Sequence, residues 1–122
     1  MTEESYKYKL ADFACKHCGK NLFNLSTFAK LQDALLLLPW KPPVNSGYRC
    51  PAHNLAVGST APEHPAGRAV DFGVTEGPKR LLIVQRLLNH GFNRIGIAKN
   101  FVHVDDYQAV PSLWLYPPKG SK

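Results

Sequence analysis

The sequence predicts a small single α+β domain with an antiparallel sheet and two main helices. Residues 26–38 and 77–92 have apolar side chains at helical spacing, and several short apolar segments between turn residues are typical of strands. The 122 residues suffice for one hydrophobic core and are too few for two, so we expect a single domain over residues 1–122. Because 44% of the residues are hydrophobic and 20% are charged, the composition indicates a globular chain rather than a disordered or fibrous one.

The first helix is predicted between Ser26, as its N-cap, and Pro39, which ends it. Its apolar residues at helical spacing are Phe28, Leu31, Leu35 and Leu38. A short strand is then predicted to begin at Val44 and to break at Gly47. The prolines and glycines of residues 51–67 predict a long irregular loop, and loops of this length usually carry function.

A second strand is predicted from about Ala69 to Val74. The second helix, over residues 77–92, is expected to begin near Pro78, a favoured first-turn residue. Gly91 is expected to cap its C-terminal end.

The last part of the chain is predicted to form a β-hairpin followed by an irregular tail. Residues 93–98 and 100–106 are short apolar segments joined by a tight turn at residues 99–100. The tail, residues 111–122, is rich in proline, so we expect little regular structure there beyond Trp114.

The charge of the chain narrows its partners only broadly. Fifteen Lys and Arg against nine Asp and Glu give a net charge of +6, which suits nucleic acid or an anionic cell envelope. The basic residues are scattered along the chain, so the sequence predicts no nucleic-acid surface. No segment reaches the roughly 18 apolar residues of a membrane-spanning helix, so we expect no membrane insertion. Residues 1–10 lack an apolar segment, so we expect no export signal there.

His64, Asp71 and His103 have the residue types of a catalytic zinc site. Such a site typically has three protein ligands drawn from His, Asp, Glu and Cys, with a fourth position left for water. His64 lies in the predicted loop, whereas Asp71 and His103 lie in predicted strands that could pair and bring the two side chains together. Taken singly, each of the three is more often a residue with a purely structural role.

Asp105 is expected on the same face of its strand as His103. Side chains alternate along a strand, so Phe101, His103 and Asp105 share one face, and Val102 and Val104 share the other. With the valines in the core, His103 would face a cleft, where Asp105 could hold its imidazole by a hydrogen bond.

Three sequence blocks occur in the order SGYRCPAHNLAVGS, EHPAGRAVDF and FVHVDD. Together they resemble the zinc D-alanyl-D-alanine carboxypeptidase family. That family also contains bacteriophage L-alanyl-D-glutamate endopeptidases, and it shares its fold with the Hedgehog signalling domain. The resemblance covers about residues 10–115, which we take as the core of the domain, and implies a zinc-dependent peptidase acting on peptidoglycan stem peptides.

The resemblance also implies roles for individual residues. The family's first histidine and its aspartate match His64 and Asp71 in HPAGRAVD, and its last ligand, in a His-Val-Asp strand, matches His103. The family arginine in the turn Ser-Gly-Tyr-Arg, thought to polarise the scissile carbonyl or hold the substrate, matches Arg49. A guanidinium suits that role because it stays charged and donates to a developing oxyanion. We therefore expect Arg49 and Asp105 to support catalysis at the zinc.

The chain departs from the family pattern at the general base. Better-known members place a catalytic Glu, Asp or His a few residues before the last ligand, where it takes a proton from water. Here that segment is Ala98, Lys99, Asn100 and Phe101, none of which is a base at neutral pH. Glu63 and Asp106 are the remaining carboxylates close in sequence, and the sequence does not decide between them.

The three cysteines raise a second metal question. Their odd number makes a poor disulfide framework and fits synthesis in a reducing compartment. Cys15 and Cys18 are spaced as a ligand pair, and so are Cys50 and His53, so these four side chains could form a structural zinc site. His17 could equally be the local ligand. We expect buried free thiols and keep the structural site as the alternative.

The leading functional hypothesis is a zinc peptidase, either a D-Ala-D-Ala carboxypeptidase or an L-Ala-D-Glu endopeptidase. The alternative is a weak or inactive domain of the same fold that binds cell wall or a protein partner. A zinc-ribbon nucleic-acid binder is a distant third. We expect a monomer that resembles a phage lysin, made in the host cytoplasm and acting in the periplasm and cell wall, or a virion-associated protein. A cytoplasmic bacterial enzyme acting on wall fragments is a further alternative.

Overall fold

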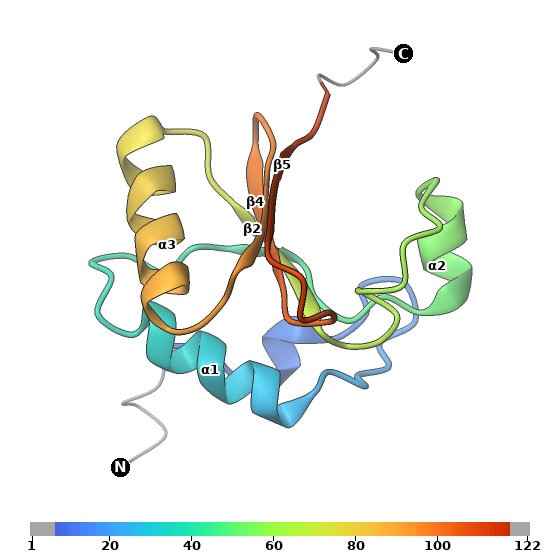
Figure 1. The fold of residues 1–122 in the computed structure, drawn as a ribbon. Coiled ribbons are helices and arrows are strands. Elements are labelled where there is room, and N and C mark those ends of the chain that lie inside the picture. The colour runs from blue at the N-terminus through green and yellow to red at the C-terminus, as the bar shows by residue number, and fades with distance from the viewer. Residues whose placement is uncertain (1–6, 118–122) are drawn as a thin grey trace.

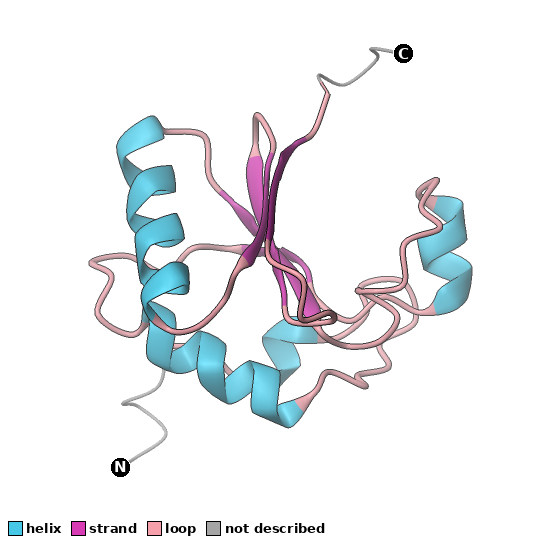
Figure 2. Cartoon of the chain, viewed as in Figure 1, coloured by secondary structure: helices cyan, strands magenta, loops and turns pink. Residues whose placement is uncertain are grey.

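The computed structural model describes residues 7–117 (Figure 1; Figure 2). The expected lack of an export signal concerns residues 1–10, of which 1–6 lie outside the described residues, as do residues 118–122 of the tail. Within residues 7–117, no helix combines the length and the apolar character needed to cross a membrane.

A five-stranded sheet lies at the centre of the fold, with strand order β1-β2-β4-β3-β5. The strands are β1 (Val44–Ser46), β2 (Ala69–Gly73), β3 (Arg94–Ile97), β4 (Phe101–Asp105) and β5 (Ser112–Leu115). The pairs β1–β2, β2–β4 and β3–β4 are antiparallel, whereas β5 runs parallel to β3. The α+β class is confirmed, and the sheet is mixed because of its last strand.

Two helices cover one side of the sheet. α1 (Leu25–Leu35) and α3 (Gly77–Asn89) lie on that side, and the short α2 (Pro51–Ala56) lies on the other, away from them (Figure 1). A 3-10 turn, η2 (Leu10–Phe13), precedes α1. The core side chains between helices and sheet are Leu31, Leu35, Ile83 and Leu87 from the helices, and Val70, Phe72, Val102 and Val104 from the strands.

Strand alternation separates this core from the opposite face of the sheet. Val102 and Val104 are fully buried in the core, as expected for one face of β4. His103 therefore lies on the opposite face, as does Asp71 of β2, whose Cα is the direct partner of the His103 Cα in the β2–β4 ladder.

The second helix and the hairpin follow the predicted pattern. α3 has Pro78 in its first turn, and Gly91 just beyond its end adopts φ +87°, a conformation that favours glycine. β3 and β4 are joined by a turn at residues 99–100. β2 ends at Gly73, one residue before the predicted end.

The predicted limits of α1 are wrong at both ends. The N-cap is Asn24 rather than Ser26, because the Asn24 side chain accepts a hydrogen bond from the Thr27 backbone N–H at 2.9 Å. The helix ends at Leu35, and the Leu38 N–H bonds to the Leu35 carbonyl in a tighter turn. The last turn therefore closes before the proline at position 39.

Two further predictions are corrected. Residues 51–67 are not wholly irregular, because α2 begins at Pro51, a residue whose fixed φ suits the first helical turn. Over its described residues, 111–117, the tail is not wholly irregular either, because β5 extends the sheet along the edge of β3. The Ser112 N–H donates to the Asn93 carbonyl and the Tyr116 N–H to the Ile97 carbonyl, so the pairing reaches past both ends of β5.

Candidate metal centre

The structure brings His64, Asp71 and His103 together on the sheet face opposite the core. The His103 Nδ1 lies 2.9 Å from Asp71 Oδ1, and the His64 Nε2 lies 3.4 Å from Asp71 Oδ2. One ligand atom from each of the three residues lies within 4.8 Å of the other two. The two imidazole rings meet edge to face with centroids 5.3 Å apart. Strand pairing positions Asp71 and His103, and the turn after α2 supplies His64.

Hydrogen bonds on the outer ring nitrogens orient both imidazoles. The His64 Nδ1–H donates to the Gly47 carbonyl at 2.8 Å, which leaves its Nε2 facing Asp71. The His103 Nε2–H donates to Asp105 Oδ2 at 2.7 Å, which leaves its Nδ1 facing Asp71. Metal-bound histidines in proteins almost always have such a partner on the other nitrogen. Both rings are thus oriented as metal ligands would be.

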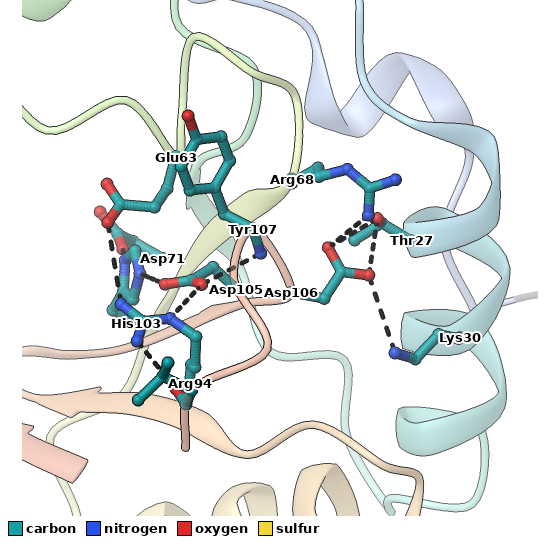
Figure 3. Close-up of polar contacts among 11 residues, drawn as sticks. Thr27, Lys30, Glu63, Arg68, Asp71, Arg94, His103, Asp105, Asp106 and Tyr107 are labelled. Atoms are coloured by element: carbon teal, nitrogen blue, oxygen red, sulfur yellow. Dashed lines mark hydrogen bonds and ion pairs between the residues drawn. The ribbon is translucent and has the colours of Figure 1, made fainter. Parts of the chain in front are cut away.

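Asp105 makes the hydrogen bond that the strand pattern predicts. Its side chain is fully buried, and its second oxygen accepts a hydrogen bond of 2.8 Å from Arg94 Nε (Figure 3). Burial by itself raises the pKa of the Asp105 carboxyl, but the bonds from His103 and Arg94 outweigh it and lower that pKa below its ordinary value. Asp105 is therefore an ionised residue that orients His103 from the ring nitrogen that does not face Asp71.

The electrostatics of the cluster favour a cation beside Asp71. Burial alone raises the pKa of the Asp71 carboxyl, but hydrogen bonds from His103 and His64 hold that pKa well below its usual range. Burial alone lowers the pKa of His103, yet its bonds to Asp105 and Asp71 raise it to about 9. The metal-free cluster thus carries an imidazolium between two carboxylates. A zinc ion fits this donor set, since it takes imidazole nitrogens and a carboxylate oxygen as ligands.

Arg49 reaches the same cluster from the segment between β1 and α2. Its Nη2 lies 3.7 Å from Asp71 Oδ2, and its guanidinium donates to Asn54 Oδ1 and Ser46 Oγ, each at 3.0 Å. The side chain is largely buried. Three polar partners therefore hold the guanidinium beside the candidate metal ligands.

A cleft of about 610 Å³ opens over the cluster. Arg49 and the three candidate ligands line it together with Val57, Ser59, Ala61, Glu63, Arg94, Phe101, Trp114 and Tyr116. The region after α2 thus contributes to the cleft, and its aromatic side chains are Phe101 of β4, Trp114 of β5 and Tyr116 just after β5.

Trp114 and Tyr116 are site residues that the sequence analysis missed. Their ring centroids lie 5.4 and 6.4 Å from that of His103. A Cβ at Gly96 would lie 2.5 Å from the Trp114 indole and 2.6 Å from the Tyr116 ring, so only glycine lets both rings cross β3 this closely. The signal in the sequence is the spacing of the two aromatics by two residues, which places them on one face of a strand.

The two carboxylates left as candidates for a general base point in different directions. Asp106 accepts hydrogen bonds of 2.9 Å from the Thr27 hydroxyl and forms ion pairs with Lys30 and Arg68, so it faces α1 (Figure 3). Glu63 lines the cleft, where its carboxylate lies 3.9 Å from Arg94 Nη2. Of the two, only Glu63 faces the candidate metal centre.

The cysteines converge at a second place. The thiols of Cys15, Cys18 and Cys50 all lie within 4.8 Å of one another. The Nδ1 atoms of His53 and His17 lie 3.8 Å from the Cys15 sulfur and 3.5 Å from the Cys50 sulfur, respectively. Cys15 and Cys50 are buried, and Cys18 is exposed.

The family of the chain follows from comparison with known proteins. A model of the Peptidase M15 family matches residues 7–105. No curated protein sequence matches the chain. Peptidases of this family are zinc-dependent, and the matched segment contains Arg49, the three candidate ligands and Asp105. The match covers most of the 122 residues, so the chain belongs to the Peptidase M15 family of metallopeptidases.

Proposed function

We propose that the chain is a zinc peptidase that hydrolyses peptide bonds in peptidoglycan stem peptides. The bond is of the D-Ala-D-Ala carboxypeptidase type or of the L-Ala-D-Glu endopeptidase type. The observation that carries the proposal is the convergence of His64, Asp71 and His103, with Arg49 beside them, on the wall of a substrate-sized cleft. Zinc bound by the three side chains would act as a Lewis acid and make water a nucleophile at neutral pH.

Arg49 has the position of an electrophilic group. Ser46 and Asn54 hold its guanidinium at the cleft surface next to Asp71. The guanidinium is permanently charged, so it places a fixed positive charge there. A scissile carbonyl in the cleft would accept hydrogen bonds from it, and these bonds strengthen as negative charge develops on the carbonyl oxygen. Arg49 would therefore orient the substrate and stabilise the transition state.

Glu63 is the carboxylate that we propose as proton acceptor. It lines the cleft, whereas Asp105 is engaged with His103 and Arg94, and Asp106 faces α1. A carboxylate in that place would take a proton from the attacking water and pass it to the leaving amine. The Glu63–Arg94 separation of 3.9 Å is long enough for the carboxylate to remain available.

One observation favours the alternative of a binding domain with little or no activity. The four residues before His103 contain no carboxylate or histidine, so the base of better-known family members is missing. In that case the same cleft would bind cell wall or a protein partner without cleaving it. The presence of Glu63 in the cleft favours the peptidase.

The setting that goes with the peptidase is the bacterial cell wall. The net charge of +6 suits this anionic polymer, and no nucleic-acid or membrane partner is proposed. We propose a monomer that acts on peptidoglycan peptides as a phage lysin or as a virion-associated enzyme.

Turnover by the zinc-loaded protein tests the proposal. Purified peptidoglycan and two synthetic stem peptides, one ending in D-Ala-D-Ala and one containing L-Ala-D-Glu, are incubated with wild type and with His103→Ala. Cleavage of one peptide by wild type alone, seen by mass spectrometry, supports the peptidase and identifies the bond. If wild type holds zinc and cleaves neither the peptides nor the wall, the domain is the binding module.

A further inference from the structure

The segment 15–20 folds as a tight turn that presents two thiols on one side. The Cys15 N–H donates to the Lys20 carbonyl at 2.7 Å, and the Gly19 N–H donates to the Cys15 carbonyl at 2.8 Å. Gly19 has φ +79°, a conformation that favours glycine. The turn therefore has the Cys-x2-Cys-Gly form in which paired cysteines bind zinc from a single loop.

A second pair of donors comes from the start of α2. Cys50 is the N-cap residue, and its sulfur accepts a hydrogen bond from the His53 N–H at 3.4 Å. This bond holds the Cys50 thiol over the first turn of the helix, and the His53 ring reaches the Cys15 sulfur, 3.8 Å from its Nδ1. Both lie against the Cys15 turn, since the Cys50 N–H donates to the Cys15 sulfur at 3.4 Å.

The spacing of the three sulfurs, and of the Cys15 sulfur from His53, is compatible with a tetrahedral zinc site. With Zn–S bonds of about 2.3 Å and Zn–N bonds of about 2.0 Å, neighbouring donors lie roughly 3.5–3.8 Å apart. The Cys15 sulfur and His53 Nδ1 are separated by 3.8 Å, and the three sulfurs lie within 4.8 Å of one another. A disulfide would use two of the sulfurs and leave the third thiol and the imidazole unexplained.

His53 is a better fourth ligand than His17. Ligand pairs in structural zinc sites are separated by at least two residues, as in Cys50-x2-His53. His17 directly precedes Cys18, so both would have to turn toward one ion from adjacent positions in a turn. The His17 ring lies 5.3 Å from the His53 ring, centroid to centroid, and would then flank the site.

We propose that Cys15, Cys18, Cys50 and His53 form a second, structural zinc site, distinct from the candidate metal centre in the cleft. It ties the N-terminal turn to the start of α2. That helix has little apolar anchoring of its own, since Leu55 is 68% exposed and only Asn54 of its residues is buried. The metal supplies the attachment that a hydrophobic core supplies elsewhere.

The position of this site gives it a consequence for the cleft. Cys50 directly follows Arg49, and Asn54 of α2 holds the Arg49 guanidinium at 3.0 Å. Loss of the metal therefore loosens the segment that places Arg49 beside Asp71. The second zinc site stands independently of the peptidase proposal, whereas this consequence for Arg49 rests on it.

Metal content of four variants tests the site directly. Zinc per chain is measured by elemental analysis in wild type, Cys18→Ser, His53→Ala, His17→Ala and His103→Ala, each purified under reducing conditions. Cys18 is exposed, so its substitution by serine leaves the core intact, and circular dichroism checks each fold. We expect two zinc ions in wild type and His17→Ala, and one in each of the other three variants.

Cobalt substitution identifies which ion each variant loses. Cobalt bound to thiolates gives an intense near-ultraviolet charge-transfer band, and this band should be absent from Cys18→Ser and present in His103→Ala. Retention of zinc and of the band in Cys18→Ser overturns the site, and loss of the second ion in His17→Ala but not in His53→Ala overturns the fourth ligand. One zinc in wild type that disappears with Cys18→Ser leaves this inference standing and contradicts the proposed function.

Thiol reactivity provides a test that needs no variant. The wild-type chain has three cysteines, so a thiol reagent should react slowly with all three until a chelator is added. The three thiols should then react as one zinc ion is released to a metal-sensing dye. Immediate reaction of the exposed Cys18 with no zinc release contradicts the proposal.

Discussion

Asp71 and His103 face each other across the β2–β4 ladder, with 2.9 Å between Asp71 Oδ1 and His103 Nδ1. Both side chains come from paired strands and neither comes from a loop. The sheet therefore fixes the positions of two of the three candidate metal ligands. His64 reaches the pair from a turn, and its ring is fixed by the Gly47 carbonyl. Because two candidate ligands lie on strands and His64 lies on a turn, we expect metal loss to disturb that turn more than the sheet.

Asp71→Asn should remove the zinc of the cleft while leaving the fold. The asparagine amide has the size of the carboxylate but lacks its negative charge and one of its acceptor oxygens. Zinc binding depends on that charged oxygen ligand. We expect one zinc fewer per chain after dialysis. Peptide cleavage should fall by more than about 100-fold, because loss of a ligand should cost more than the roughly 10–100-fold typical for loss of a residue that only hydrogen-bonds to a ligand. Asp33→Asn, at an exposed position of α1, is the matched control. Full zinc content in Asp71→Asn would remove Asp71 from the ligand set.

Asp105→Asn should weaken the same zinc without removing a ligand. Asp105 holds the outer nitrogen of His103, and loss of such a partner typically costs about 10–100-fold in metal affinity or activity. Asp106→Asn is the matched control. The Asp106 carboxylate is next in sequence, but it contacts Thr27, Lys30 and Arg68 and not His103. Competition with a chelator measures zinc affinity in both. Equal affinities in the two variants would contradict the orienting role of Asp105.

Much of this arrangement follows from local sequence patterns. The alternation of valines with His103 in FVHVD predicts one core face and one polar face, and the structure has Val102 and Val104 in the core. The helical spacing in residues 77–92 predicts α3 almost to its ends. These patterns succeed because burial of one face dominates the energetics of each element.

The missed features depend on contacts that no local pattern encodes. β5 pairs with β3 in parallel, and nothing in the segment after Pro111 marks which edge it will join. α2 is too short for a helical period, and its anchoring comes from side chains such as Asn54 rather than from an apolar face. Glu63 and Asp106 are equivalent in sequence terms, and only the course of the chain shows that one faces the cleft and the other α1.

Replacement of Arg49 should lower turnover while zinc stays bound. Arg49→Lys keeps the charge but cannot reproduce the bonds to Ser46, Asn54 and the substrate carbonyl at once. Loss of one oxyanion donor typically costs about 100–1,000-fold in kcat, so we expect a loss of this size in both Arg49→Lys and Arg49→Ala. Arg68→Lys, at a partly exposed site beside Asp106, serves as the control. Unchanged kcat in Arg49→Ala would mean that Arg49 is only structural.

Glu63→Gln should separate proton transfer from metal binding. If Glu63 accepts the proton of the attacking water, its amide form should lower kcat by about 100–10,000-fold with zinc content and KM little changed. Glu76→Gln, an exposed position before α3, provides the comparison. A variant with wild-type kcat would require another base.

The metal-free protein should lose stability as the pH rises, opposite to the trend in zinc binding. In the absence of metal, bonds to Asp105 and Asp71 raise the pKa of His103 from its ordinary value of 6.5 to about 9. Because the pKa of His103 is higher in the folded state, its protonation stabilises the folded protein. This contribution is complete below pH 6.5 and disappears as the pH rises through about 9.

Zinc requires the neutral ring, so its affinity should increase over the same interval. The difference in unfolding midpoint between wild type and His103→Ala in chelator reports the histidine together with its coupling to Asp71 and Asp105. That difference should shrink between pH 6.5 and 9. A difference that grows with pH would show that His103 is neutral in the metal-free fold and that Asp71 is not held by an imidazolium.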